Sequence, residues 1–307
     1  MEIRDLRYFL AAAEIGHLHK AAEQIGRSQP ALSKCIRRLE TEVGAKLFEP
    51  AGRGIRLTAV GQSLLPRARM LVRGMQDVVR EITEMADGQA GHVRVGSSPT
   101  AAEWLLPDLF HAVLTQSPGV TFEVSTGLGG VLRQSLSDGK LDLVVSPLFP
   151  SDTPAFTSFA VAEDVLVVAA RHGHPLQQRA TAVPQGAIGM RDLLESGWLL
   201  PVDSLASTIW LNRAFEAKGL PRPRLQVETD SVTLLRRVVA KTDLLTFISR
   251  RDLASGDEAL LSEVAVPDLA MPRHLGALTM PGRYVPPAAQ RLLLLLRELG
   301  QTGAGSR

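Results

Sequence analysis

A set of residues near the N-terminus has side chains suited to contact with DNA bases and phosphates. Glutamine can hydrogen-bond adenine, lysine and arginine can reach guanine or phosphate, and a serine hydroxyl adapts to either. The set fits the exposed face of one helix, from about residue 29 to residue 40, with a proline in its first turn: Gln29, Pro30, Ser33, Lys34 and Arg37. The opposite face is an apolar stripe of Leu32, Ile36 and Leu39. A polar helix face is often only a solvated surface, so the neighbouring segments decide between the two interpretations.

The segments before and after this helix favour DNA binding. Apolar spacing predicts a first helix from about Asp5 to Ile15 and a short second helix that ends at Gly26. Ser28 is placed as the N-cap of the third helix, so the three helices form a helix-turn-helix. The apolar runs 46–48 and 55–57 then flank a turn-rich stretch, 50–54, which predicts a hairpin with Arg53 at its tip. Such a hairpin is a wing, and its arginine can enter the minor groove.

Charge and composition agree with this interpretation. The chain has 307 residues and a net charge of +2. Residues 1–89 hold 14 Lys and Arg against 11 Asp and Glu, a surplus of three that suits a part meeting phosphate. No apolar run reaches the roughly 20 residues that span a bilayer, and the start of the chain does not resemble a secretory signal. We therefore expect a cytoplasmic protein that does not enter a membrane.

The other short motifs do not assemble an enzyme or a metal site. Gly127-Leu128-Gly129-Gly130 lacks the spacing of a dinucleotide-binding loop, and Ser137 to Lys140 is better explained as a turn. The single cysteine, Cys35, excludes an internal disulfide, and half-burial as a small apolar residue is favoured over a redox role. The histidines have no carboxylate or third histidine at ligand spacing. We predict no enzymatic activity, no metal and no cofactor.

A long helix is predicted from Thr58, as its cap, to about residue 89. Apolar residues recur along it at alternating spacings of four and three, as in the seam of a coiled coil. Packing on its own domain is the alternative, but a domain ending near residue 57 leaves no surface for so long a stripe. We therefore predict pairing with a second subunit through Leu64, Ala68, Leu71, Met75, Val78, Ile82 and Met85.

From residue 92 onward, strands and helices alternate, which predicts a mainly parallel sheet covered on both faces. The expected strands are 93–96, 120–124, 141–145, 165–169, 198–200, 224–228, 244–248 and 274–279. The expected helices include 100–116, 129–138 and 287–299.

The first 62 residues resemble the LysR family of bacterial transcription regulators. The matching stretches are LRYFLAAAE, AAEQI, SQPALSKCIRRLE, GAKLF and GIRLTAVGQ. The chain departs from the family at the second helix, where it has His17-Leu18-His19-Lys20, and at Pro50 and Cys35. The resemblance implies that Gln29, Pro30, Ser33 and Lys34 contact bases and backbone, with Arg53 in the wing.

The resemblance also implies a fold for the rest of the chain. The C-terminal part would be an α/β domain of two lobes, like a type 2 periplasmic binding protein, with a ligand cleft between them. The expected organisation is a winged helix-turn-helix at 1–57, a linker and dimerisation helix at 58–91, and an effector domain at 92–307. Lobe one would comprise about 92–161 and 267–300, and lobe two about 162–266.

Effector contacts are expected where strands end and helices begin. Ser97, Ser98 and Thr100 follow the first strand, where hydroxyls and backbone N–H groups can hold an anion, although ordinary helix capping explains them too. By the resemblance, the remaining contacts are Thr126, Ser146, Pro201, Val202, Asp203 and Phe247. Because no arginine is evident at these positions, an anionic effector would depend on dipoles and hydroxyls, whereas Asp203 would favour a polar or cationic one.

The function implied is that of a regulator whose promoter binding or activation is controlled by a small-molecule effector. The implied partners are double-stranded promoter DNA, an effector such as a small organic acid, RNA polymerase, and further copies of the chain in a homodimer or homotetramer. The alternative is a ligand-sensing interaction protein whose DNA binding has degenerated. Retention of Gln29, Ser33, Lys34 and Arg53 argues against that alternative.

Overall fold

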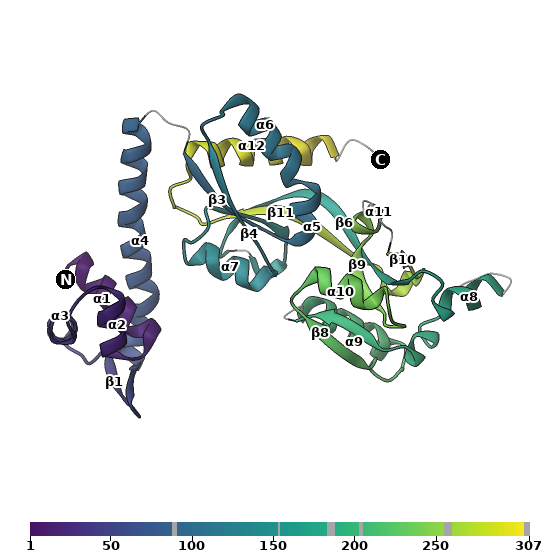
Figure 1. The fold of residues 1–307 in the computed structure, drawn as a ribbon, viewed down its shortest axis with the longest axis horizontal. Helices are drawn as coiled ribbons and strands as arrows, with labels where there is room; N and C mark the ends of the chain where they lie inside the picture. The colour runs from purple at the N-terminus through teal and green to yellow at the C-terminus, as the bar shows by residue number, and fades with distance from the viewer. Residues whose placement is uncertain (88–90, 153, 183–187, 203–204, 255–259, 304–307) are drawn as a thin grey trace. The chain divides into compact units, whose positions relative to one another are not determined.

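The computed structural model describes residues 1–87, 91–152, 154–182, 188–202, 205–254 and 260–303. The chain divides into two compact units, Met1–Gln89 and Ala90–Arg307 (Figure 1).

The first unit is a winged helix-turn-helix followed by a long helix. Its elements are α1 (Ile3–Ile15), α2 (Leu18–Gln24), α3 (Gln29–Val43), β1 (Phe48–Ala51), β2 (Gly54–Leu57) and α4 (Ala59–Asp87). Gly16 and Gly44 end α1 and α3 in the left-handed conformation, at φ 68° and 73°, as expected for helix C-caps. Ser28 has the backbone conformation of the α3 N-cap, but its side chain makes no capping hydrogen bond.

The predicted apolar stripe of α3 is confirmed. Leu32, Ile36 and Leu39 are all buried, where they meet residues of α1 and α2 in two small aliphatic clusters. The polar face of α3 is left outside by this packing, because residues three and four apart on a helix share one side.

The wing is confirmed, with a shorter turn than predicted. Pro50 pairs with Ile55 and Ala51 with Gly54, so only Gly52 and Arg53 form the turn. Two-residue loops are the commonest connections in β-hairpins. Because this hairpin has such a loop, Pro50 and Ala51 lie in β1 and not in the turn. Gly54 is required where the wing meets α1, since a Cβ there would lie 2.4 Å from the carbonyl oxygen of Gly16.

Helix α4 begins as predicted, because the N–H group of Gly61 donates to the Thr58 hydroxyl oxygen at 3.1 Å. Its first turns, however, belong to the core of the first unit. Ala68 is fully buried and Leu64 half-buried against residues of α1 and the wing. The prediction that Ala68 contacts a second subunit is therefore wrong, because its own domain covers it. Leu64 packs partly against the same core, so only part of its side chain remains exposed.

The second unit contains the remaining strands and helices. Its strands are β3 (His92–Ser97), β4 (Thr121–Thr126), β5 (Leu143–Pro147), β6 (Thr157–Arg171), β7 (Trp198–Pro201), β8 (Leu225–Thr229), β9 (Thr246–Ser249), β10 (Leu261–Glu263) and β11 (Met271–Thr279). Its α-helices are α5 (Pro99–Trp104), α6 (Leu106–Gln116), α7 (Gly129–Ser137), α8 (Pro175–Ala182), α9 (Leu205–Ala217), α10 (Val232–Val239), α11 (Arg250–Ala254) and α12 (Pro287–Gly303). Short 3₁₀ turns are η1 (Pro150–Asp152), η2 (Asp192–Glu195) and η3 (Pro267–Leu269).

The largest sheet is mixed, which corrects the expectation of a mainly parallel one. Seven strands run in the order β10-β6-β11-β5-β3-β4, with β9 also paired to β6. Strand β3 pairs in parallel with β4 and β5, but β11 and β6 enter antiparallel and bring β9 and β10 with them. Strands β7 and β8 form a separate parallel pair. The expected helix 100–116 is interrupted at Leu105, and α6 begins at Leu106 with Pro107 in its first turn, where a proline cannot donate to the preceding turn.

Alternation along the strands explains the layers of the first lobe. Val93, Val95 and Leu143 point into a core shared with α6 and α12, whereas Val144 packs with α7 on the other face. Figure 1 shows α6 and α12 on one side of the sheet and α7 on the other.

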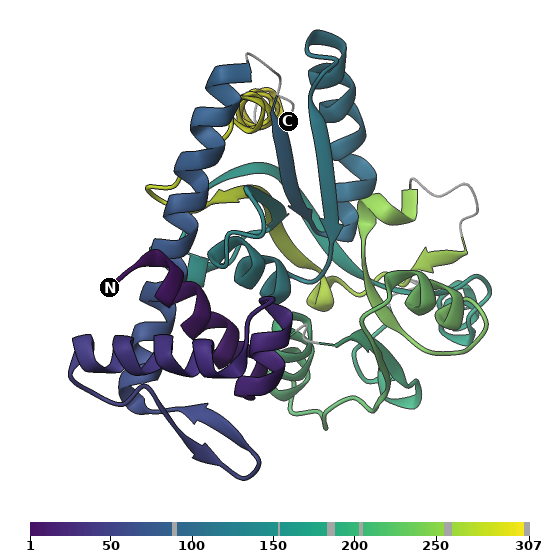
Figure 2. The ribbon, with the colours of Figure 1, turned by 60° about the vertical axis from the view of Figure 1, so that its left-hand side comes forward.

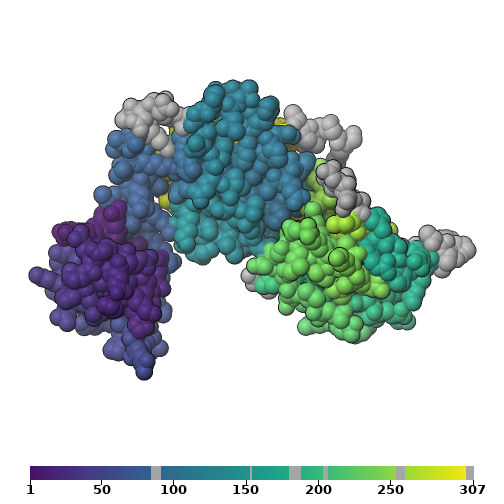
Figure 3. Space-filling view, in the orientation of Figure 1, coloured from purple at the N-terminus to yellow at the C-terminus, as the bar shows by residue number. Residues whose placement is uncertain are grey.

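Strands β6 and β11 connect two separate cores. Strand β6 pairs with the whole of β11 and then continues past it to pair with β9 and β10, and the views in Figures 1 and 2 follow this path. Beyond it lies a second core around Trp198, Phe215 and Leu193. In the space-filling view the blue and green parts of this unit form two masses that meet along a narrow boundary (Figure 3). The residue limits of the two lobes stay a prediction.

None of the described helices combines the length and the apolar character needed to cross a bilayer.

Candidate DNA-binding face and interlobe cavity

The exposed face of α3 carries the predicted DNA contacts. Gln29, Pro30, Lys34 and Arg37 are exposed and Ser33 is half-buried. Arg53 is exposed in the turn of the wing. The first unit thus presents a helix face and a hairpin tip with the residue types that read and clamp DNA.

Ion pairing separates the cations of this unit into two groups. Arg38, Lys46 and Arg56 are each paired with a carboxylate of the same unit. Lys34, Arg37 and Arg53 have no ion pair or side-chain hydrogen bond to any residue that the structure describes. Unpaired cations bind phosphate at the lowest cost, because no existing contact must break. Arg27, at the turn before α3, is also exposed and unpaired among the described residues, although it was not among the predicted contacts.

Two buried carboxylates hold the helices and the wing together. Asp5 of α1 accepts hydrogen bonds from Arg38 and from the Cys35 thiol of α3, the latter at 3.1 Å. Glu40 accepts from the backbone N–H groups of Leu47 and Phe48 at 2.9 and 3.4 Å, and from Lys46 at 2.8 Å.

These contacts change the acidities of the groups involved. Burial alone would raise the pKa of both carboxyl groups, but their hydrogen bonds outweigh it, and the pKa of each lies below its ordinary value. Burial and the neighbouring Asp5 raise the pKa of Cys35, so the thiol stays protonated at neutral pH. This agrees with the non-redox interpretation of Cys35.

The middle of α4 exposes an apolar stripe. The members of the predicted seam beyond Ala68 are exposed, at 41% for Leu71, 45% for Met75, 52% for Val78 and 61% for Ile82. Val79, next to them, is 56% exposed. Met85 lies on the same helix, and its side chain is outside the described residues. A stripe of this kind on a long helix is typical of a surface covered by a second helix.

The second unit contains a cavity of about 450 Å³ lined from both lobes. The first lobe contributes the starts of α5 and α7 and the segment after β5. The second lobe contributes the end of β7, the start of α10, and β9 with α11. Another cavity, of about 580 Å³ beside α8 and η2, includes none of the predicted contacts. The interlobe cavity is the candidate ligand site, because its volume suits a small molecule and strand ends converge on it.

Four of the nine predicted effector contacts line this cavity: Ser98, Thr100, Pro201 and Phe247. Ser98 also caps α5 by accepting from the Ala101 N–H group at 3.4 Å, so its capping and lining roles coexist. Val202 and Thr126 are exposed and do not line it. Asp203 lies outside the described residues.

Ser97 and Ser146 are corrections. Both are fully buried and neither lines the cavity. The Ser97 hydroxyl donates to the carbonyl oxygen of Ser98 at 3.0 Å, and Ser146 lies in contact with the Arg133 guanidinium at 3.5 Å. Both hydroxyls are therefore engaged inside the first lobe and are not available to a ligand in the cavity.

The expectation of a cavity without arginine is also wrong, since Arg133 of α7 and Arg273 of β11 both line it. Neither arginine was predicted, because Arg133 lies within α7 and Arg273 lies near the start of β11, away from the positions directly after strands where contacts were expected. Asp252, Phe149 and the stretch from Gly127 to Gly130 were not predicted either. The glycines follow β4 and begin α7, so the rule used for Ser98 would have found them.

Each of the two units matches a known protein-family model. Residues 3–62 match the family model described as "Bacterial regulatory helix-turn-helix protein, lysR family". Residues 86–301 match the model described as "LysR substrate binding domain".

Individual relatives cover most or all of the chain. The SDS degradation transcriptional activation protein of a Pseudomonas species is 30% identical over 315 residues, covering 99% of this chain and 99% of that protein. The regulator ShiR of Corynebacterium glutamicum is 34% identical over 241 residues, covering 76% of this chain and 79% of its own.

Solved structures share the fold. The crystal structure of full-length CbnR with its target DNA has a TM-score of 0.64 at 22% identity, over 97% of this chain and 100% of that one. A full-length OxyR variant from Pseudomonas aeruginosa also has a TM-score of 0.64, at 21% identity, over 98% of this chain and 97% of its own. The winged helix-turn-helix, the two-lobed α/β domain and both family matches together show that this chain belongs to the LysR family of DNA-binding transcription regulators.

Proposed function

We propose that two or more copies of this chain bind promoter DNA through α3 and the wing, and that a small molecule in the interlobe cavity controls this binding. The observation that carries the proposal is the coexistence of an exposed, unpaired basic face on one unit with a lined cavity in the other. RNA polymerase would be the partner whose recruitment to the promoter changes with effector binding. These events would take place in the bacterial cytoplasm, where the DNA lies.

The proposed division of labour follows the predicted domains. Residues 1–57 bind DNA, 58–91 pair subunits and link the units, and 92–307 bind the effector between lobes at about 92–161 with 267–300 and at 162–266. The base and phosphate contacts are Gln29, Pro30, Ser33, Lys34, Arg37 and Arg53.

The exposed stripe of α4 supports the pairing of subunits. Two DNA-binding units held by paired helices would contact an interrupted palindrome, since a twofold protein matches a twofold site. Effector binding would shift the lobes, and thereby the spacing of the DNA-binding units and the bend of the DNA.

The double variant Lys34→Ala with Arg53→Ala tests the DNA-binding residues. Each lost contact is expected to weaken operator binding by about tenfold or more and to lower the salt dependence by about one released counterion. Gel shifts at several salt concentrations, with promoter fragments selected by the native protein, measure both effects. Analytical ultracentrifugation should find the oligomer unchanged.

Arg56→Ala is the matched control, because Arg56 lies in the same wing but is paired with Glu49 at 2.8 Å. It should change affinity much less than the double variant. Unchanged affinity of the double variant at every salt concentration would reject the assignment of Lys34 and Arg53.

A further inference from the structure

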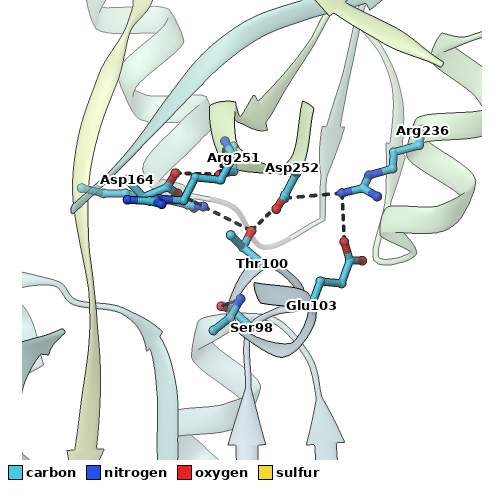
Figure 4. A network of polar contacts seen from close by, with 10 residues as sticks. Ser98, Thr100, Glu103, Asp164, Arg236, Arg251 and Asp252 are labelled. Carbon is cyan, nitrogen blue, oxygen red and sulfur yellow. Dashed lines mark hydrogen bonds and ion pairs between the residues drawn. The ribbon is translucent and has the colours of Figure 1, made fainter. Parts of the chain in front are cut away.

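The charged side chains around the interlobe cavity differ in how well they are compensated. Three of them line it: Arg133, Arg273 and Asp252. Figure 4 shows the network that surrounds Asp252, between α5 of the first lobe and α10 and α11 of the second. The pairing of each charge indicates which kind of ligand group the cavity can accept.

Every N–H donor of the Arg133 guanidinium is already engaged in a hydrogen bond. Its Nε and Nη2 atoms donate to the two carboxylate oxygens of Asp152, the second at 2.6 Å. Nη2 also donates to the carbonyl oxygen of Pro147 at 2.7 Å, and Nη1 to that of Gly129 at 3.2 Å and to Ser146 at 3.5 Å. These contacts use all five N–H groups of a guanidinium, and the buried Asp152 cancels its charge. Arg133 is therefore a structural part of the cavity wall.

Arg273 is also paired with a buried carboxylate. Its Nε and Nη2 atoms both lie 2.6 Å from the carboxylate of Asp164, whose side chain is fully buried. Nη2 also donates to the Thr100 hydroxyl oxygen at 3.5 Å, whereas Nη1 has no hydrogen-bond partner among the described residues. Asp164 also accepts from the Ser249 hydroxyl at 2.6 Å, which fixes it in place. An anionic ligand would have to compete with a buried carboxylate for this arginine.

Asp252 is the least compensated of the three. Its Oδ2 atom accepts from the Thr100 hydroxyl at 3.0 Å and lies 3.5 Å from Arg236, which is shared with Glu103 at 3.4 Å. Its Oδ1 atom has no hydrogen-bond partner within the described part of the chain. Burial raises the pKa of Asp252, and the contacts with Thr100 and Arg236 offset this only in part. Its charged form would therefore gain from a further donor.

Most of the remaining cavity wall is apolar. Its apolar side chains come from both lobes: Leu128, Phe149, Leu166, Val232, Leu235, Phe247 and Ile248. Such a wall accepts an aromatic or branched aliphatic body, and a few polar groups then fix its orientation.

We infer that Asp252 determines effector class, and that the cavity takes an apolar primary amine whose ammonium group donates to Oδ1 of Asp252. This rests on the proposed function, because it names the ligand of the proposed effector site. An ammonium group supplies both the donor and the positive charge that Asp252 lacks. A carboxylate on the same body would face Asp252 with a like charge, while both arginines are already paired.

Three probes of one shape test this with the full-length protein. 2-Naphthylmethylamine, 2-naphthylmethanol and 2-naphthoate share one aromatic body and differ in the charge of their polar end. We expect the amine to bind most tightly and the acid most weakly in calorimetry or ligand-observed NMR at neutral pH. Asp252→Asn should weaken the amine about tenfold or more, while the alcohol changes little because the amide oxygen still accepts.

Glu103→Gln is the matched control. It removes the other carboxylate that pairs with Arg236, but Glu103 does not line the cavity, so the order of the probes should be kept. The relative affinities of the amine and the acid are measured on the native protein. They therefore test the preference for an amine even if Asp252→Asn fails to fold.

Tighter binding of naphthoate than of the amine would overturn the inference, and would assign selection to the helix starts at Gly129 and Val232. That result would leave the cavity standing as an effector site. Binding of none of the three probes would overturn the inference together with the effector role of the cavity. Neither result bears on DNA binding, which the Lys34 and Arg53 variants test separately.

Discussion

At the scale of single residues, Asp5 and Glu40 show why formally basic positions of the helix-turn-helix are not all equivalent. Asp5 engages Arg38, and Glu40 engages Lys46. These two cations therefore serve the fold of the first unit, whereas Lys34 and Arg37 of α3 have no ion pair among the described residues and are proposed to contact DNA. A count of lysines and arginines in α3 overstates its capacity to bind phosphate.

Glu40 also positions the wing, because its carboxylate receives the N–H groups of the first wing residues, Leu47 and Phe48. Glu40→Gln keeps the shape but removes the charge, and hydrogen bonds to charged groups contribute about 1.5–3 kcal/mol. We expect faster hydrogen exchange of the wing amides in this variant. DNA affinity should fall in the native background but little further in Arg53→Ala, since both changes act through the wing.

The stability of the wing should also depend on pH through Glu40. Because the pKa of Glu40 in the folded chain lies below its ordinary value, its contribution is present above the ordinary pKa and is lost as the pH falls through the folded one. Protection of the wing amides, corrected for intrinsic exchange, should therefore decline below about pH 4.5 in the native protein. The decline should be smaller in Glu40→Gln, and equal declines would exclude Glu40 as its cause.

At the scale of elements, the sequence was most informative where periodicity is strong and local. The stripe of α3 and the caps at Gly16 and Gly44 are set within a few residues, so α1 and α3 were predicted nearly to their ends. The turn of the wing was misjudged, because Pro50 can sit in a short edge strand as well as in a turn.

Features that depend on distant partners could not be predicted in the same way. Strand periodicity does not encode direction, so nothing local indicated that β6 and β11 run antiparallel to β3 and β5. The charged contacts around the cavity could not be predicted for the same reason. Thr100 meets Asp252 across 152 positions, and Arg273 meets Asp164 across 109. The predicted hydroxyls Ser98 and Thr100 at the start of α5 line the cavity, but Ser97, Thr126 and Ser146 do not, and the charges that shape the cavity were not predicted.

Helix α4 is an element with two distinct parts. Its first turns pack on α1 around Ala68 and Val72, and its middle exposes Leu71, Met75, Val78 and Ile82. The change from covered to exposed explains how one apolar pattern can serve both its own domain and a second subunit.

Charge placed on the exposed part of α4 should separate the subunits. Val78→Glu with Ile82→Glu would bury four unpaired carboxylates in a dimer, and each costs several kcal/mol. We expect the oligomer to dissociate in analytical ultracentrifugation at micromolar concentration, and palindromic operator affinity to fall with it. Gln76→Glu, at an exposed polar position of the same helix, should change neither. An intact dimer in the double variant would place the subunit interface elsewhere.

At the scale of the whole molecule, each unit of this LysR-family chain contains one part of a regulator. The first unit has the DNA-binding face and the second has a cavity whose walls come from two lobes that share β6. Because Thr100 lines the cavity and also contacts Asp252 of the other lobe, a ligand there contacts the same groups that hold the lobes together. We therefore expect occupancy of the cavity and the arrangement of the lobes to be coupled.

The most direct test of the central claim is a selection of genomic fragments by the purified full-length protein, scored by gel shift against competitor DNA. We predict enrichment of a promoter with an interrupted palindrome, and loss of that enrichment with the Lys34→Ala and Arg53→Ala double variant. Weak binding that is indifferent to sequence would contradict the account, and would favour a ligand-sensing interaction protein whose DNA binding has degenerated.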